Sequence, residues 1–279
     1  MTESFRYKDI NWDRNRIMLV PAEPPHKVVQ LEQDECRELL STRKVSFIRW
    51  TTGWDLAEST SFWYVIKDQY DGINEFSRNT RSKIRRGLKR NSIRQITREE
   101  LKNEGFNVYK AAFLNYNTLL DPLNEKEFYE RIDGLQDDIY DLWGVYRDNK
   151  LIAYTEIRKL GRVRNTSITK FHPDYLKDYP SYALFYTLID YYLSSPGVSY
   201  ITNGTRSIFH KTNIQDFLIS KFNYRKAYCK LHVYYKPAVK WMINLLYPFN
   251  PLISKIPLVI FQKLSMLLTQ EYFRRQCND

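Results

Sequence analysis

Residues 140–171 read YDLWGVYRDNKLIAYTEIRKLGRVRNTSITKF, and this stretch decides the fold. Three segments rich in β-branched and aromatic residues, at 140–146, 151–160 and 164–171, are separated by Asp148-Asn149 and by Gly161. Such segments bounded by turn residues predict strands, and short turns join antiparallel strands. The stretch therefore predicts an antiparallel meander of three strands.

Helices and strands alternate after the meander. The patterns predict a helix at 181–193, a short strand at 198–202, a helix at 213–222 and a last strand at 226–235. From residue 140 the order is thus β, β, β, α, β, α, β. This order predicts an α/β (α+β) fold with a mixed, largely antiparallel central sheet flanked by helices.

The upstream half also has strand and helix patterns. Residues 45–67 contain two bursts of β-branched and aromatic residues around a glycine-bearing connection, which predicts two strands. Apolar residues then recur every three or four positions from Ile73 to Leu88, which predicts a helix. A short strand at 92–97 follows. Helices are predicted at 98–120 and at 125–135, the second opened by Asn124 as its cap.

Composition limits the class of protein. The chain has 279 residues, 43% hydrophobic and 15% aromatic, so it can bury a substantial core. Its formal net charge of +11 favours polyanionic partners such as nucleic acid, phosphorylated cofactors or an acidic membrane. Cys36, Cys229 and Cys277 are too few and too far apart for a disulfide framework or a CxxC site. With an N-terminus that lacks a secretory pattern, they favour a cytoplasmic protein.

The predicted element order resembles the core of the GNAT acyl-coenzyme A transferase fold. The upstream segments RSKIRRGLKR (81–90), TREEL (97–101), NEKEFYERI (124–132) and NKLIAYTEI (149–157) make it similar to the Fem-type branch of that superfamily. This branch comprises the aminoacyltransferases that build peptidoglycan cross-bridges and their bacterial acyltransferase relatives. The resemblance covers residues 45–235.

The resemblance implies an organisation and an activity. Residues 1–97 are expected to form a partial N-terminal GNAT-like region ending in a basic helix, 98–236 a GNAT-like acyltransferase domain, and 237–279 an apolar and basic helical tail. The implied reaction moves an acyl group from a thioester or aminoacyl donor to an amine or hydroxyl of a glycan, lipid-linked or small-molecule acceptor, in cell-envelope glycan assembly. The alternative is a binding protein that keeps the scaffold without catalysis and holds polyanions or a membrane surface.

The donor site departs from the family pattern. GNAT enzymes usually have a glycine-rich loop where backbone N–H groups meet the pyrophosphate of acyl-coenzyme A at a helix N-terminus. Here residues 172–185 read HPDYLKDYPSYALF, with no glycine. Pro180 still suits a helix start, and the N–H groups of Ser181, Tyr182 and Ala183 are predicted to bind an anion. An aminoacyl-tRNA or another carrier remains open as the donor.

Two residues are candidates for proton transfer. Glu156, flanked by apolar and hydroxyl residues on a predicted strand, could have a raised pKa and act as the base. A solvent-facing glutamate is its alternative. The resemblance implies that Tyr228, in the last strand, protonates the leaving thiolate, and a packing role is its alternative. Cys229 is expected to be a buried small apolar residue rather than a nucleophile.

Ligand contacts are also predicted after the 198–202 strand. Asn203-Gly204 follows its carboxyl end, where α/β folds commonly place ligands, although an ordinary turn explains the pair equally well. Arg206, His210 and Lys211 form a cluster suited to a phosphate or carboxylate, or else a solvated loop. The four histidines lack metal-ligand spacing, so no metal is predicted.

The strongest local signal is the basic helix. No acid occurs between Phe76 and Arg98, and nine arginines and lysines fall in this interval and at its end. On a helix Arg81, Arg85 and Lys89 share one face, and Arg78, Arg86 and Arg90 share another. We predict polyanion binding by Arg81, Arg85, Arg86 and Lys89, against ion pairing or a solvated face as alternatives. No motif for sequence-specific DNA binding occurs.

The C-terminal region is apolar. Residues 241–270 contain only Lys255 and Lys263 as charges and are interrupted by three prolines, so no uncharged run reaches the ~20 residues that a spanning helix needs. With Arg274-Arg275 at its end, the region suits in-plane attachment to an anionic surface at the inner face of the membrane. The alternative is a helical appendage packed on the protein or between subunits.

Overall fold

A computed structural model describes residues 3–115, 121–208, 213–256 and 258–277. The chain forms two compact units. Unit 1 comprises Met1–Tyr64, Thr205–Lys211 and Lys226–Asp279, and unit 2 comprises Val65–Gly204 and Thr212–Arg225. The expected boundaries after residues 97 and 236 do not coincide with these units. The chain leaves unit 1 within a strand and returns to it twice. Unit 1 is therefore made of three separate segments, whereas the prediction divided the sequence into consecutive domains.

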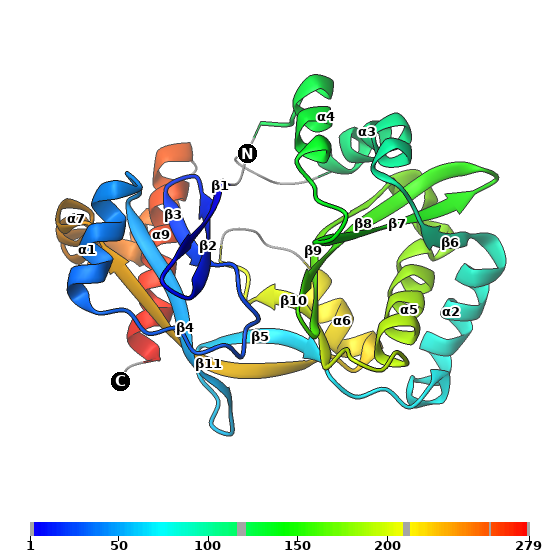
Figure 1. Ribbon diagram of the computed structural model, residues 1–279, viewed down its shortest axis with the longest axis horizontal. Coiled ribbons are helices and arrows are strands. Elements are labelled where there is room, and N and C mark those ends of the chain that lie inside the picture. Colours follow the sequence, from blue (N-terminus) through cyan, green and yellow to red (C-terminus); the bar gives the residue numbers. More distant parts are fainter. Residues whose placement is uncertain (1–2, 116–120, 209–212, 257, 278–279) are drawn as a thin grey trace. The chain divides into compact units, whose positions relative to one another are not determined.

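Unit 1 contains a sheet in the strand order β1-β2-β3-β4-β11 (Figure 1). The strands are β1 (Glu3–Tyr7), β2 (Ile10–Asn15), β3 (Met18–Pro21), β4 (Phe47–Leu56) and β11 (Arg225–Tyr235). Neighbours are antiparallel except for β3 and β4, which are parallel. Strand β5 (Phe62–Lys67) carries the chain from unit 1 into unit 2.

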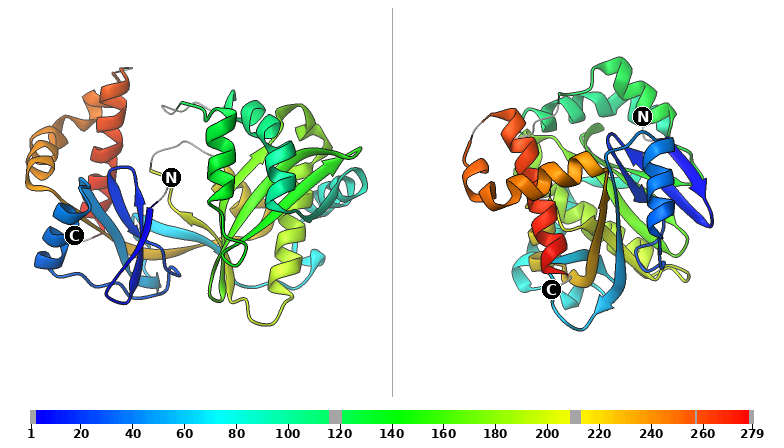
Figure 2. Two further views of the ribbon diagram at one scale, coloured as in Figure 1. Left: turned by 45° about the horizontal axis from the view of Figure 1, so that its top comes forward. Right: turned by 90° about the vertical axis from the view of Figure 1, so that its left-hand side faces the viewer.

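Helices cover both faces of this sheet. Helix α1 (Gln33–Thr42) packs on the face to which Ile48 of β4 points. The neighbouring Phe47 points to the other face, where it meets the tail helices. These are α7 (Pro237–Leu246), η3 (Tyr247–Phe249), α8 (Asn250–Ile253) and α9 (Val259–Gln276). Figure 2 shows α1 and the tail on opposite sides of β4 and β11. The predicted helical tail thus contributes one side of the core of unit 1.

Unit 2 contains the predicted meander. Its strand order is β10-β9-β8-β7-β6, antiparallel except for β9 and β10. The strands are β6 (Ser92–Gln95), β7 (Tyr140–Arg147), β8 (Lys150–Leu160), β9 (Val163–Phe171) and β10 (Tyr200–Thr205). Asp148 and Asn149, both at positive φ, form the β7–β8 turn, and Gly161 lies in the β8–β9 turn.

The helices of unit 2 also lie on both faces of its sheet (Figure 1). Helices α3 (Arg98–Phe113) and α4 (Glu125–Asp133) bury Tyr109 and Phe128 against Tyr154 of β8. Asn124 caps α4 as predicted, in a capping box with Glu127. On the other face lie α5 (Pro180–Leu193) and α2 (Arg78–Arg90). The remaining elements are η1 (Ile73–Glu75), η2 (Pro173–Asp178) and α6 (Ile214–Phe222).

These observations confirm the predicted fold class of a mixed, largely antiparallel sheet flanked by helices. Two helices depart most from their predicted bounds. The basic helix begins at Arg78 rather than at Ile73, because Ser77 caps it and a 3-10 turn precedes it. Helix α3 ends at Phe113, and residues 116–120 of the predicted helix lie outside the described residues.

Candidate functional site

The two parallel strands of unit 2 diverge. Strand β10 pairs with β9 only from Tyr200 to Thr202, opposite Val163 to Asn165. Within the described residues, 166–171 of β9 have β8 as their sole strand partner. Ser167 is an extra residue in β9, because Glu156 pairs with Ile168 while Ile157 pairs with Thr166. An edge of β9 is thereby left to pair with an extended polar ligand.

Glu156 lies next to this bulge but does not face solvent. It is 1% exposed, which overturns the solvent-facing alternative. Both carboxylate oxygens accept hydrogen bonds from Arg131 of α4, at 2.7 Å from Nη2 to Oε1 and 2.9 Å from Nη1 to Oε2. Burial opposes the charge of Arg131, but the Glu156 carboxylate outweighs it and raises the pKa of Arg131 overall. The predicted base is therefore one half of a buried ion pair.

Lys170 is a candidate that the sequence did not indicate. It lies on the part of β9 that pairs with β8 but not with β10, opposite Tyr154 of β8, with Nζ 5.8 Å from the ring centre of Tyr109. Burial first, and Arg131 second, lower the pKa of Lys170 to about 8, although Glu156 acts in the opposite sense. An amine with this pKa is well suited to proton transfer near neutral pH. The sequence gives only a weak indication of this role. Lys170 is two positions after Ile168 on a strand, so both side chains lie on the face towards α3 and α4.

The N-terminus of α5 retains part of the predicted anion site. Tyr179 precedes the helix in a left-handed conformation at φ 56° and provides no side-chain cap. Among the described residues, the N–H groups of Ser181 and Tyr182 have no hydrogen-bond acceptor. The N–H of Ala183 is not available to an anion, because it donates to the Tyr179 carbonyl at 3.2 Å. Two of the three predicted donors can therefore bind an anion.

The basic helix packs directly on this N-terminus. A Cβ added at Gly87 of α2 would lie 2.6 Å from the Tyr179 carbonyl oxygen, so the two backbones approach closely. Lys83 Nζ lies 3.5 Å from the Tyr182 hydroxyl, and the Arg86 guanidinium lies 4.8 Å from the Tyr179 ring centre. The structure thus brings the predicted anion site and the predicted basic helix together.

The four predicted polyanion residues have different surroundings. Arg81 donates to the carbonyls of Asn74 and Phe76 and supports the turn before α2. Arg85, Arg86 and Lys89 are exposed. Arg85 and Lys89 have no ion pair with a described residue, so α2 presents cations to solvent. On the same helix Arg90 pairs with Asp178 at 2.8 Å.

Asn203 and Gly204 lie within β10 rather than in a turn after it, because the strand continues to Thr205. The Asn203 carbonyl accepts from Gln215 Nε2 at 3.3 Å. Gly204 has φ 74°, and apart from its chain neighbours no atom of the described residues comes within 4 Å of where a Cβ would lie. The Gly204 N–H donates to the Thr202 hydroxyl at 3.1 Å. Open space beside a glycine on the diverging strand is compatible with the predicted ligand contact.

Arg206 and Tyr228 belong to unit 1, whereas Glu156 belongs to unit 2. The Arg206 guanidinium lies 4.3 Å from the Trp63 ring centre and 3.8 Å from that of Phe273, and donates to the Ser61 carbonyl at 2.7 Å. Burial lowers its pKa. Tyr228 packs edge-on against Trp63, with ring centres 6.1 Å apart. Both residues therefore have packing partners. His210 and Lys211 lie outside the described residues.

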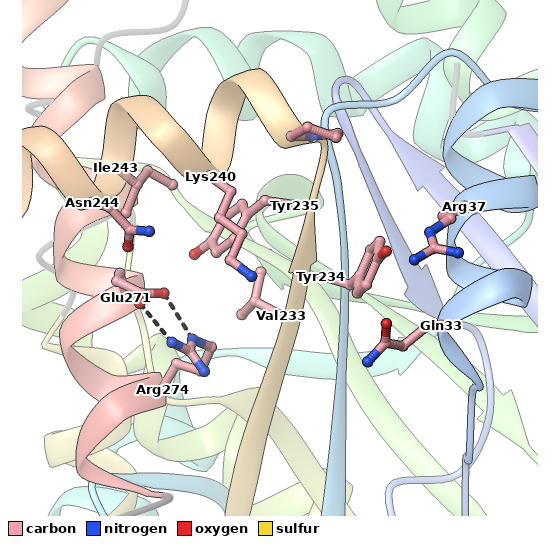
Figure 3. A pocket seen from close by; sticks show the side chains of 11 residues that line it. Gln33, Arg37, Val233, Tyr234, Tyr235, Lys240, Ile243, Asn244, Glu271 and Arg274 are labelled. Carbon is pink, nitrogen blue, oxygen red and sulfur yellow. Dashed lines mark hydrogen bonds and ion pairs between the residues drawn. The ribbon is translucent and has the colours of Figure 1, made fainter.

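Unit 1 has a pocket of its own (Figure 3). It has a volume of about 400 Å³ and lies among α1, β11, α7 and α9. Its charged lining residues are Arg37, Lys240, Glu271 and Arg274. Arg37 pairs with Asp34, and Arg274 binds Glu271 through two hydrogen bonds at 2.8 and 2.7 Å. Lys240 has no ion pair among the described residues, so the pocket has one uncompensated positive charge.

The three cysteines are buried thiols. Burial first, and Cys277 second, raise the pKa of Cys229 to about 12, which agrees with the predicted packing role. No group of three or more His, Cys, Asp or Glu residues suited to a metal occurs in the described parts of the chain.

Comparison with solved structures identifies the type of fold. No protein-family model and no curated protein matches the chain. FemX superimposes with a TM-score of 0.56 over 84% of this chain and 85% of its own, at 12% identity. The C-terminal domain of a putative lysylphosphatidylglycerol synthetase from Agrobacterium fabrum gives 0.55 over 88% of both chains, at 11% identity. L-PGS from Bacillus licheniformis gives 0.54 over 99% and 90%, at 12% identity.

The chain therefore has a GNAT-like fold of the Fem type, as the sequence predicted. At 11–12% identity this likeness shows the fold alone.

Proposed function

We propose that the protein is an acyl- or aminoacyltransferase that acts on an amine or hydroxyl of a glycan- or lipid-linked acceptor. The Fem-type fold supports the class of enzyme, because its structural neighbours include FemX and a putative lysylphosphatidylglycerol synthetase. The observation that carries the proposal is the divergence of β9 and β10, since it opens a strand edge beside Lys170 and leads into the N-terminus of α5.

The proposed reaction needs one proton acceptor. The acceptor nitrogen or oxygen attacks the donor carbonyl, its proton passes to a base, and the thiolate or alkoxide of the donor leaves and takes up a proton. Both oxygens of Glu156 bind Arg131, so we assign the base to the neutral amine of Lys170. Glu156 then acts as a positioning residue. Tyr228 as the acid for the leaving group stays a prediction.

The proposed donor carries phosphate. Lys83 and Arg86 contact the side chains of Tyr182 and Tyr179 at the end of α5 where the N–H groups of Ser181 and Tyr182 lie, so a helix N-terminus and two cations belong to one region. This arrangement suits the pyrophosphate of acyl-coenzyme A or the phosphates near the end of an aminoacyl-tRNA. Cations supply here part of the attraction that a glycine-rich loop provides through backbone N–H groups.

Thermal unfolding tests the donor. Purified protein is heated with a panel of acyl-coenzyme A thioesters, with aminoacyl-tRNA, and with free coenzyme A and ATP as controls. A donor at about 100 times its Kd should raise Tm by roughly 5 °C or more, because it binds only the folded state. Lys83→Met with Arg86→Met should remove the shift, and Lys126→Met on the exposed side of α4 should not. If no donor raises Tm, the transferase proposal fails.

The non-catalytic alternative has one observation in its favour, the engagement of the predicted base by Arg131. It predicts polyanion binding through the exposed cations of α2. Arg85→Gln with Lys89→Gln should then lower the slope of log K against log salt by about 0.9 per charge for duplex nucleic acid. An unchanged slope would exclude α2 as the binding surface.

A further inference from the structure

The tail of unit 1 exposes an unusual share of apolar surface. The described residues include fourteen exposed large apolar side chains, and half of them fall between positions 241 and 260. These seven are Trp241, Leu245, Phe249, Leu252, Leu258, Val259 and Ile260. Trp241 and Ile260 are 69% and 73% exposed. Single exposed apolar residues are common, but a concentration of this kind marks an interaction surface.

The exposure of these side chains does not come from a lack of buried residues in the tail. The same elements bury another set of residues, with Ile243, Ile253 and Leu268 packed on Phe47 and Tyr235. Trp241 and Leu245 are four positions apart on α7, so they share a face of that helix. Buried side chains of the tail therefore complete unit 1, while seven large apolar side chains of the same elements stay exposed. We call the seven exposed residues the outer tail face.

The charges around the outer tail face have one sign. No aspartate or glutamate occurs from Phe217 to Gln270. Lys240, Lys255 and Lys263 are exposed, and none forms an ion pair with a described residue. Arg274 and Arg275, which the sequence suggested as the basic end of the tail, both bind Glu271. Two arginines share one carboxylate, so this end keeps one net positive charge in addition to those of the three lysines.

We propose that the outer tail face docks in the plane of an anionic lipid bilayer. Exposed Trp, Phe, Leu and Ile enter the boundary between headgroups and acyl chains, and unpaired lysines attract anionic headgroups. The described part of the tail is divided into α7, η3, α8 and α9, and no helix in the described part of the chain is long and apolar enough to cross a membrane. A symmetric dimer through this face is disfavoured, because it would bring lysines of both copies together without an acid.

Vesicle sedimentation with the full chain tests this proposal without donor or acceptor, so its result is independent of the transferase proposal. Vesicles containing phosphatidic acid, an anionic lipid without an amine or an alcohol hydroxyl, are compared with vesicles of phosphatidylcholine alone. We expect binding to the anionic vesicles, weakened about tenfold or more by Trp241→Ser with Leu245→Ser. Lys240→Gln, Lys255→Gln and Lys263→Gln together should also weaken it about tenfold or more and reduce its salt dependence.

Matched controls are available on unit 2. Leu114→Ser with Leu176→Ser removes equally exposed apolar side chains, and Lys110→Gln with Lys126→Gln and Lys177→Gln removes the same number of charges. These variants should bind the vesicles like the unchanged protein. The proposal is overturned if the protein does not bind anionic vesicles, or if control and tail variants lose binding equally. It is also overturned if Trp241→Ser with Leu245→Ser instead dissolves a concentration-dependent dimer.

Discussion

At the scale of the residue, the centre of unit 2 is a group of three charges, Arg131, Glu156 and Lys170. Glu156 could be found from sequence because it interrupts an apolar strand. Arg131 and Lys170 could not, because a helix and a neighbouring strand bring them to Glu156 only after folding. Their effects on one another depend on burial, which the sequence does not give.

The pKa of Lys170 leads to a prediction about pH. Its pKa is about 8 instead of 10.5, so the neutral amine appears as the pH rises through 8. We expect kcat/KM for transfer to rise as the pH rises through 8. Lys170→Met should lower kcat/KM by roughly 100-fold or more and remove this pH dependence. Stability should change in parallel. Between pH 8 and 10.5 the unfolded chain binds more protons, so the free energy of unfolding rises with pH.

Urea unfolding at several pH values measures the second effect, and Lys170→Met should abolish the rise. If the mutant keeps the same pH profile of kcat/KM, Lys170 is not the base.

The Arg131–Glu156 pair leads to a prediction about stability. Glu156→Gln leaves a largely buried guanidinium without its counter-charge, so we expect a loss of about 3 kcal/mol in the free energy of unfolding. Arg131→Met with Glu156→Met should lose less than the single variant, since it leaves no uncompensated charge. Chemical denaturation compares the two. Equal losses would show that the pair contributes through packing rather than charge.

At the scale of the element, α2 and α5 are joined through a glycine. Gly87→Ala would place a methyl group 2.6 Å from the Tyr179 carbonyl oxygen and 3.1 Å from Ala183 Cβ. We expect a loss of about 2 kcal/mol in stability, because neither helix can retreat without opening the core. Gly134→Ala is the matched control, since its nearest contact would be at 3.5 Å. Thermal unfolding of both variants tests this, and equal Tm values would contradict it.

The strands that the sequence predicted and those that it did not predict differ in the residues of their connecting turns. The meander was visible because Asn149 and Gly161 occupy positive-φ turn positions, as turn statistics favour. The first three strands were not predicted, because Lys8 and Arg16 take the positive-φ positions between them. Neither residue is a turn signal. Strand β1, ESFRY, also has little apolar character to mark it.

At the scale of the whole molecule, the predicted fold is confirmed but the domain limits are not those of the compact units. Sequence patterns describe neighbours along the chain, whereas unit 1 combines residues from both ends of it. The composition of the tail made a separate appendage plausible. It nevertheless supplies Leu268 and Phe273 to the buried clusters of unit 1.

The tail should therefore contribute to stability. Leu268 is fully buried, and we expect Leu268→Ala to lower the free energy of unfolding by about 3 kcal/mol through lost burial and the cavity left behind. Leu245→Ala, on the exposed side of α7, should change it by less than about 0.5 kcal/mol. Urea titrations of both variants measure the difference. A small effect of Leu268→Ala would mean that the tail is detachable.

The interleaving of the two units has a consequence for biosynthesis. Phe47 of β4 pairs with Tyr235 of β11, and all of unit 2 is translated between them. At typical ribosomal speeds the edge of β4 and the apolar Phe47 stay without β11 for roughly 10 s or more after their synthesis. Unit 2 can fold during that interval, while unit 1 cannot be completed until translation has passed β11. The nascent chain is thus expected to need a chaperone at its first unit rather than at its second.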